Sequence, residues 1–407
     1  MTIFGIIWMA IIVYCFFSKD IEKMLFLALT SMIFQSTNMI VINEISMGPQ
    51  IVTCTFFLIK CILIRKEWSK ISINKINIGA TMIICSVIIS SLINNTLGKN
   101  ILKIVQLIIY MLTFFNVSYF YKFIEIKNIT KFLKNLTVFV LSIGIIQILS
   151  SGSIIQRIPV ISELFFNERA QNIYYWHNNY FRLTSVFMEP SYCGCFLVGV
   201  FFYFCSIYKS NDIRMLILLI ATLIGIIMTQ STTAYLSVFI VSIIFLIWGK
   251  NKYVKRILIS SVVIFMVLMI LFGSNLLDKV IFSKANSGSS LTRTNWNQNA
   301  IEAFKKSKII GIGYKNLRAS SIIYSILGEL GIVGLISYIF FNFQIYKKIF
   351  KTKKSEIVGL SYSIVAITIC QIISCPDLDL CIYWLFLDLV SLSGMKFKNR
   401  EAFDEKR

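Results

Sequence analysis

Glu189 stands directly before a proline and a long apolar segment, in the run Phe187-Met-Glu-Pro-Ser191. Pro190 suits the first position of a helix, because the N–H group that proline lacks has no intrahelical partner there. Glu189 would then lie at the positive end of the helix dipole, which stabilises an ionised carboxylate. Such a carboxylate can accept a proton from a sugar hydroxyl. The alternative is a helix-start acid with no chemical role.

His177 is the only histidine of the chain and a second candidate for the base, because imidazole changes charge near neutral pH. A solitary loop histidine can equally be incidental. We expect the nearby Tyr180 to contact substrate, although the aromatic residues of this stretch also suit an interfacial belt at a membrane edge. A His-rich metal centre is excluded, and Cys193-x-Cys195 alone is no metal site. We therefore expect neither metal nor other cofactor.

Arg182, Arg293 and Arg318 are the candidates for binding phosphate. A guanidinium group pairs with phosphate oxygens through two parallel hydrogen bonds, so these arginines could bind a substrate diphosphate. Contact with lipid headgroups is the alternative.

The run Gly311-Ile312-Gly313-Tyr314 could bring backbone close to a ligand, because glycine has no side chain in the way. We expect Gly311, Gly313 and Tyr314 to contact substrate, and a flexible turn is the simpler reading.

Composition decides which elements can carry these residues. Of 407 residues, 57% are apolar and 14% are charged, against about 25% charged in soluble domains. A soluble globule could not hide that much apolar surface, and disorder is excluded by the same count. The net charge of +21 would suggest nucleic acid in a soluble protein, but here the basic residues lie between apolar segments and indicate membrane topology instead.

A membrane helix needs about 20 mostly apolar residues. The sequence predicts an all-α polytopic membrane protein, a single integral domain over 1–407 with about thirteen transmembrane helices (eleven to fourteen). The predicted spans are 2–18, 24–43, 47–64, 78–93, 101–121, 136–151, 191–208, 215–230, 234–249, 257–273, 323–345, 357–375 and 381–394.

Alternate connections between these spans differ in charge. One set is rich in Lys and Arg, which predicts a cytoplasmic location, whereas the short connections of the other set hold only Lys99 and Lys103. Two large loops, 152–190 and 274–322, then face outward. Trp296, Ala300 and Phe304 recur at helical spacing in the second loop and predict a short amphipathic helix. The basic set comprises 19–23, 65–77, 122–135, 209–214, 250–256, 346–356 and 395–407.

The sequence contains no Walker loop, no dinucleotide-binding fingerprint and no internal repeat. No cytoplasmic loop is large enough for a nucleotide-binding domain, so we expect any chemistry on the outer face and without ATP.

The stretch Arg182-Leu-Thr-Ser-Val-Phe-Met-Glu-Pro-Ser191 resembles the R-x-x-x-x-F-x-E-P-S element of bacterial O-antigen and exopolysaccharide polymerases. The residues from Arg293 to Gly313 resemble their second large outer loop, and Glu329-Leu-Gly331-Ile-Val-Gly334 resembles the E-x-G-x-x-G element after it. The resemblance covers about 180–340.

The resemblance implies a glycosyltransferase of the bacterial cytoplasmic membrane that acts on its outer face. Such enzymes transfer a glycan from undecaprenyl diphosphate to a sugar hydroxyl of another lipid-linked repeat unit, for O-antigen, capsule or exopolysaccharide, sometimes with a chain-length regulator as partner. Arg182 and Arg293 would bind the donor diphosphate, and Glu189 would serve as base or acceptor contact.

Two alternatives remain at this point. The related O-antigen ligases carry a His-Asn pair about ten residues before the E-x-G element, whereas this chain has Arg318-Ala-Ser-Ser there, which favours a polymerase. A flippase or transporter would place charges within spans. Asp388 is the clearest such residue, while Asp377 and Asp379, in an outer turn, could pair with a loop arginine or simply be solvated.

Overall fold

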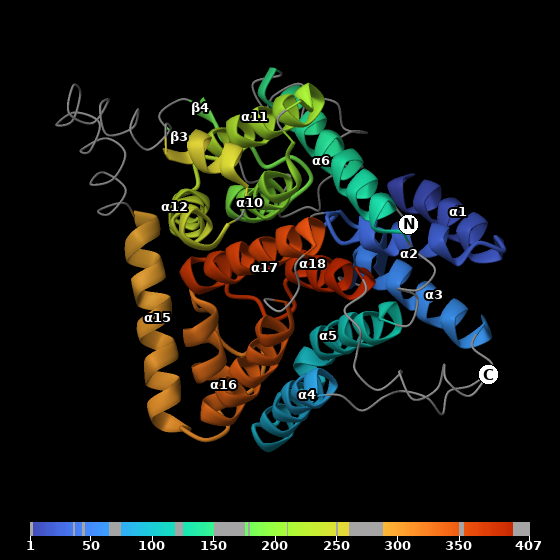
Figure 1. The fold of residues 1–407 in the computed structure, drawn as a ribbon. Coiled ribbons are helices and arrows are strands. Elements are labelled where there is room, and N and C mark those ends of the chain that lie inside the picture. The colour runs from blue at the N-terminus through green and yellow to red at the C-terminus, as the bar shows by residue number, and fades with distance from the viewer. Residues whose placement is uncertain are drawn as a thin grey trace, which may run out of the picture.

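The fold is built from helices, as the sequence predicts. The computed structural model describes residues 3–35, 37–42, 45–64, 75–118, 125–149, 176–177, 180–209, 211–249, 251–259, 288–349 and 354–393. The helices are α1 (Ile3–Phe17), α2 (Ile21–Ser31), α3 (Pro49–Ile64), α4 (Lys75–Ile93), α5 (Leu97–Val117), α6 (Ile126–Leu149), α10 (Pro190–Ile207), α11 (Ile213–Met228), α12 (Thr232–Trp248), α15 (Gly288–Lys306), α16 (Ile322–Ile349), α17 (Ser355–Ile373) and α18 (Cys381–Leu392). Figure 1 shows α17 and α18 at the centre, with the other helices around them.

The helix lengths fit a multi-pass membrane protein. Six helices in the described part of the chain are long and apolar enough to cross a bilayer, namely α4, α5, α6, α10, α16 and α17. Five shorter apolar helices accompany them: α1, α3, α11, α12 and α18. The number of thirteen spans stays a prediction, and the predicted span 257–273 lies almost wholly outside the described residues.

The predicted span 24–43 differs from the structure. Helix α2 ends at Ser31, and strands β1 (Ile40–Ile42) and β2 (Ile45–Met47) form a short antiparallel hairpin with Ile40 opposite Met47. The β-branched run Ile40-Val41-Ile42 prefers a strand, and hydropathy alone does not separate the two states.

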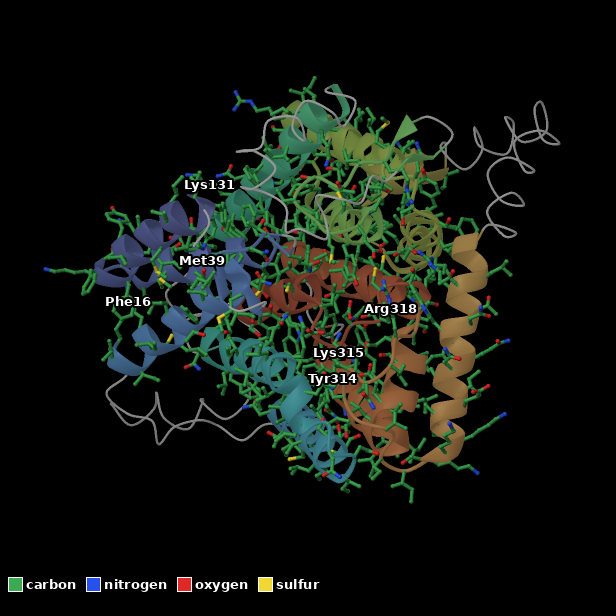
Figure 2. All side chains as sticks on the ribbon, turned by 180° about the vertical axis from the view of Figure 1, so that it is seen from behind. Phe16, Met39, Lys131, Tyr314, Lys315 and Arg318 are labelled. Atoms are coloured by element: carbon green, nitrogen blue, oxygen red, sulfur yellow. The ribbon has the colours of Figure 1, made fainter. Side chains whose placement is uncertain are left out.

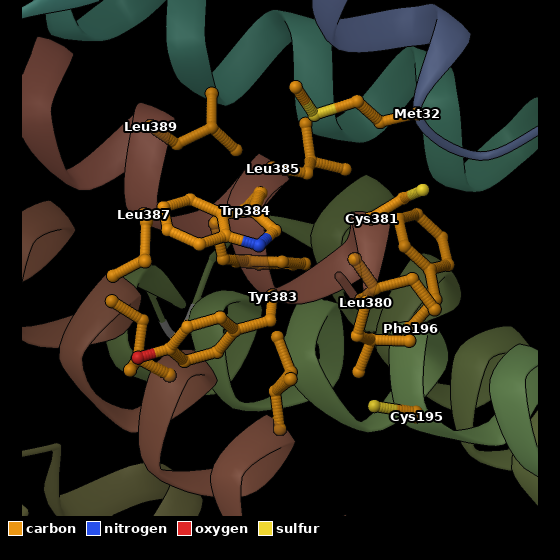
Figure 3. Packing of buried hydrophobic residues seen from close by; sticks show 14 of the residues in the cluster. Met32, Cys195, Phe196, Leu380, Cys381, Tyr383, Trp384, Leu385, Leu387 and Leu389 are labelled. Atoms are coloured by element: carbon orange, nitrogen blue, oxygen red, sulfur yellow. The ribbon is translucent and has the colours of Figure 1, made fainter. Parts of the chain in front are cut away.

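Helix α18 forms the centre of the apolar core. All of its residues are buried, from Cys381 to Leu392, and the Trp384 side chain is 1% exposed. Figure 3 shows the rings of Tyr383 and Trp384 packed among aliphatic side chains, with Phe196 of α10 nearby. A mostly apolar helix that is buried on every side belongs in the interior of a bundle, where the other helices cover it.

Contacts between connections separate the bundle into two ends. At one end, the Lys60 ammonium of α3 donates to the carbonyls of Cys15 and Ser18 at 2.7 Å and thereby caps α1. At the same end, Asn128 donates to Glu22 at 2.8 Å. Glu22 and Asn128 belong to the Lys- and Arg-rich connections 19–23 and 122–135, so two of the basic connections lie at the same end. Lys60 therefore has a structural partner and need not mark a transport path.

Helix α16 contains a break that shapes the opposite end. Gly331 has φ 65° and ψ −160°, a conformation that lies outside the helical region. The loop before α16 docks against this break: Ile332 N–H donates to the Lys308 carbonyl at 2.9 Å, and Val333 N–H to that of Ile309 at 3.2 Å. A side chain at Gly331 would collide with the Ile309 carbonyl, so glycine is required here.

Candidate functional site

The two predicted outer loops meet where α10 begins. Glu189 of the first loop is the N-cap of α10, with extended backbone, and Pro190 occupies the first helical position as predicted. The Glu189 carboxylate accepts no N-cap hydrogen bond from a backbone N–H group of α10. Instead it lies 3.6 Å from Nη2 of Arg318, from the second loop, and accepts a hydrogen bond from Ser191 Oγ at 3.3 Å. Two polar segments far apart in sequence thus share one site.

Helix α15 holds Arg318 in place, and its presence confirms the helix predicted in the second loop. The Arg318 guanidinium carbon lies 4.2 Å from the centre of the Trp296 ring, a cation–π arrangement. One residue further along α15, the Asn297 amide donates to Ser320 Oγ at 3.1 Å and accepts from Ser320 N–H at 2.9 Å. These contacts fix both the side chain of Arg318 and the backbone that follows it.

The Arg318–Glu189 pair is weak by its geometry. The Arg318 side chain is 65% exposed and that of Glu189 30%, and 3.6 Å is longer than a charge-assisted hydrogen bond. Exposed pairs of this kind contribute about 0–1 kcal/mol to stability. A hydrogen bond from Arg to a charged group contributes about 1.5–3 kcal/mol, so a phosphate could compete successfully for this guanidinium.

Lys315, also from the second loop, forms a second and tighter ionic contact. Its ammonium lies 2.5 Å from Asp377 Oδ1 and 2.8 Å from Asp379 Oδ1, in the turn between α17 and α18. The Tyr192 hydroxyl, in the first turn of α10, donates to the other oxygen of Asp377. We call Tyr192, Lys315, Asp377 and Asp379 the Lys315 cluster. Figure 2 places Lys315 near Tyr314 and Arg318, and well apart from Phe16 and Lys131.

The charges of the Lys315 cluster stabilise one another. Burial by itself disfavours the charged form of Asp377, but the adjacent Lys315 ammonium and the Tyr192 hydroxyl outweigh it and hold the pKa of Asp377 below its usual range. Burial likewise opposes the charged form of Lys315, but Asp377 and Asp379 raise the pKa of Lys315 well above its usual value. Lys315 and Asp377 therefore both carry charge at neutral pH.

The Gly311–Tyr314 loop approaches the backbone of α16 closely. Ile312 N–H donates to the Gly328 carbonyl and Gly313 N–H to that of Glu329, both at 3.0 Å. Gly311 (φ 69°) and Gly313 (φ 103°) have backbone conformations that favour glycine. The close approach we expected toward a ligand is thus made by the chain itself, so these glycines support the site from behind.

Tyr314 also lies inside the protein. Its ring is fully buried, and its carbonyl accepts from the Asn100 amide at 2.8 Å. Its hydroxyl has no hydrogen-bond partner among the described residues. A direct contact between substrate and Gly311, Gly313 or Tyr314 stays a prediction.

Arg182 binds the end of a neighbouring helix. Its Nε donates to the Thr229 carbonyl at 3.1 Å and its Nη2 to the Gln230 carbonyl at 3.2 Å. Thr229 is the C-cap of α11, where a cation compensates the partial negative charge of the helix end. Arg182 therefore has a structural role here, and its predicted contact with diphosphate is a separate, untested proposal.

Arg293 lies on α15, one turn before Trp296. Positions 293, 296, 297 and 300 share one helical face, and Ala300 is buried against α16. Arg293 is half-buried on this face, which places it on the same side of α15 as the stacked Arg318.

His177 and Tyr180 belong to a short hairpin. Strand β3 (Trp176–His177) pairs with β4 (Tyr180–Phe181), with His177 opposite Tyr180. Their side chains lie outside the described part of the structure, as do residues 152–175 of the first loop, so their predicted roles stay predictions.

Sequence reasoning missed three contributors to the site. Trp296 was seen only as a packing residue, and Lys315 was not singled out. For Asp377 the sequence left open a pairing with a loop arginine, and the partner is Lys315 instead. The sequence held one signal for Lys315. It follows Gly-x-Gly-Tyr directly and adds a positive charge to a loop on the side of the membrane where the short connections are poor in Lys and Arg. Among the described residues, no group of three His, Cys, Asp or Glu side chains could hold a metal.

A comparison with known families matches this region. Residues 217–339 fit the family model described as O-Antigen ligase, a segment that contains Trp296, Lys315 and Arg318 and ends before Asp377. No curated protein matches the chain. The match covers a minor part of the chain, and together with the polytopic helical fold it supports a relation to the superfamily of O-antigen ligases and polymerases.

Proposed function

We propose that the protein is a polysaccharide polymerase of the bacterial cytoplasmic membrane, acting on its outer face. It would transfer a glycan from undecaprenyl diphosphate to a sugar hydroxyl of another lipid-linked repeat unit, in O-antigen, capsule or exopolysaccharide assembly. The observation that carries the proposal is the meeting of Glu189 and Arg318, one from each large loop, at the start of α10. A candidate base and an anion-binding group thus lie together at one end of the bundle.

The proposed step needs only these kinds of group. The acceptor hydroxyl oxygen attacks the anomeric carbon of the donor sugar, and its proton passes to the Glu189 carboxylate. The bond between that carbon and the diphosphate oxygen breaks, and the lipid diphosphate leaves with the electron pair. Arg318, with Arg293 and Arg182, would stabilise the charge that develops on the leaving group. His177 remains the second candidate for the base.

The positive end of α10 supports an anion at this place. Its backbone N–H groups and dipole favour negative charge within the first turn. Because the Glu189 side chain does not cap its own helix, it remains available to other partners.

An O-antigen ligase is the second candidate, because the matching family model carries that description. A ligase would transfer a finished polymer to a different acceptor, whereas a polymerase extends the polymer itself. The absence of histidine at 318–324 favours the polymerase.

The saccharide ladder from a deletion strain tests these candidates. Loss of the polymerase should leave single repeat units on the outer face. Long lipid-linked polymer that is not attached to its acceptor would instead indicate a ligase. Repeat units trapped on the inner leaflet would indicate a flippase, and an unchanged ladder would contradict all three.

A further inference from the structure

Glu189 and a donor diphosphate require the same partner. The anion that faces the Arg318 guanidinium in this structure is the Glu189 carboxylate, at 3.6 Å. The proposed reaction needs Arg318 to hold a diphosphate and Glu189 to accept a proton. While the Glu189 carboxylate faces Arg318, its oxygen is directed at the guanidinium and not at an acceptor hydroxyl. The two roles conflict unless the pair separates.

We propose that the donor diphosphate displaces Glu189 from Arg318, so that binding of the donor releases the base for the acceptor. This inference rests on the proposed function and deepens it, because it sets an order of binding: donor first, acceptor second. The Glu189 carboxylate serves as an internal substitute for the diphosphate until the donor arrives.

The two ionic contacts made by the second loop have different strengths, and this difference supports an exchange. The contacts of Lys315 are short, with the ammonium bound by two carboxylates, and Asp377 also accepts from Tyr192 of α10, so the Lys315 cluster keeps the loop and α10 together. The Glu189–Arg318 pair is longer and exposed. A diphosphate can therefore replace the outer pair while the inner cluster preserves the geometry.

Trp296 is the positioning residue of this exchange. Its ring supports one face of the guanidinium at 4.2 Å, and Asn297 anchors the following backbone through Ser320. Arg318 can thus release Glu189 without losing its place. The ring stacks on the face of the guanidinium. The N–H donors lie at its edge and can therefore still bind phosphate oxygens.

Competition predicts a specific effect on the binding of inorganic pyrophosphate, used as the probe. In Glu189→Gln the internal competitor is gone, so pyrophosphate should bind the purified full-length protein about three- to fivefold more tightly, as expected for loss of a weak exposed ion pair. Glu302→Gln is the matched control: Glu302 is an exposed residue of α15, and the substitution removes the same charge. Its affinity should stay near that of the unmodified protein.

A double-substitution cycle tests whether the effect passes through Arg318. In an Arg318→Gln background, Glu189→Gln should no longer change the affinity, which calorimetry measures directly. Binding should also alter tryptophan fluorescence, and Trp296→Phe should remove that signal. Equal shifts in Glu189→Gln and Glu302→Gln, an effect that persists without Arg318, or no pyrophosphate binding at all would each overturn the exchange.

The double-substitution cycle tests the anion exchange, and the saccharide ladder tests the polymerase, so each proposal can be refuted without the other. Coupling between Glu189 and Arg318 without any effect of the protein on the saccharide ladder would refute the polymerase and leave the anion exchange standing. Polymer formation together with an uncoupled pair would refute the exchange alone.

Discussion

Lys315 and Asp377 lie 62 positions apart in the sequence, yet the ammonium and the carboxylate approach to 2.5 Å. Asp377 also accepts from Tyr192 of α10. This one carboxylate therefore joins three segments: the α10 start, the loop before α16 and the turn before α18. The arrangement explains how loops far apart in sequence are held at one site.

The Lys315 cluster predicts a dependence of stability on acid. Because the folded-state pKa of Asp377 is depressed, its stabilising contribution is present above its unfolded pKa of about 4 and is lost as pH falls through the lower folded value. We expect the melting temperature of the wild type to fall below about pH 4 more steeply than that of Asp377→Asn. A thermal-shift series from pH 3 to 7 measures this, and parallel curves would contradict it.

The raised pKa of Lys315 sets the alkaline limit of the pH range in which the Lys315 cluster stabilises the fold. Its contribution is present below the unfolded pKa of about 10.4 and is lost only as pH rises through the higher folded value, so it is constant across the physiological range. Lys315→Met should destabilise at neutral pH, since Asp377 and Asp379 then face each other without a counter-charge. The double variant with Asp377→Asn should be milder than the sum of the two single variants.

Gly331 predicts a requirement for glycine at the break of α16. Gly331→Ala should lower stability by about 1–3 kcal/mol or more, because alanine is strained at φ 65° and its Cβ would meet the Ile309 carbonyl. Gly98→Ala in α5 is the control, since a Cβ at that position meets nothing within 4 Å. Thermal unfolding of both variants in the same detergent compares them. Equal melting temperatures would contradict the strain.

Glu189 is predicted to be the base of the proposed transfer. Glu189→Gln keeps the shape of the side chain but cannot accept the proton, so turnover should fall by about 10²–10⁴-fold. Glu302→Gln should retain turnover. The measurement is polymer formation from lipid-linked repeat units by protein at equal membrane levels. Undiminished turnover in Glu189→Gln would transfer the role to His177 or another group.

Substitution of Arg293 and of Arg182 is predicted to have different effects on thermal stability. Arg293→Ala should abolish polymer at an unchanged protein level, because Arg293 lies on the same face of α15 as the stacked Arg318 and, among the described residues, no contact of its side chain caps a helix as those of Arg182 do. Arg182→Ala should abolish polymer and also lower thermal stability, since Arg182 caps α11 through Thr229 and Gln230. Immunoblots and saccharide ladders from the same membranes test both. Normal chain length in the two variants would refute the diphosphate role.

Asp388 is predicted to be dispensable for the fold. It is fully buried in α18, and neither carboxyl oxygen has a hydrogen-bond partner among the described residues. Replacing a buried unsatisfied polar group with an apolar group of similar size is often neutral or stabilising, so Asp388→Leu should not lower the melting temperature. A marked loss would show that Asp388 binds a proton, water or side chain that matters.

The sequence by itself determined the features that depend on neighbouring residues. Runs of apolar residues fix where helices can cross a membrane, and Pro190 fixes where α10 begins, because both effects act within a few turns of chain. The same local reasoning erred at 24–43, where a β-branched run reads equally as strand or helix.

Only the tertiary structure decided which polar residues meet. Glu189 and Arg318, Lys315 and Asp377, and Trp296 and Arg318 are brought together by packing of α10, α15, α16 and α17 rather than by spacing along the chain. Whether two loop residues pair depends on how the helices between the loops are arranged. Hydropathy predicts which segments are buried, but it does not predict which segments are neighbours. The sequence therefore predicted the types of residue in the site, but not which of these residues contact one another.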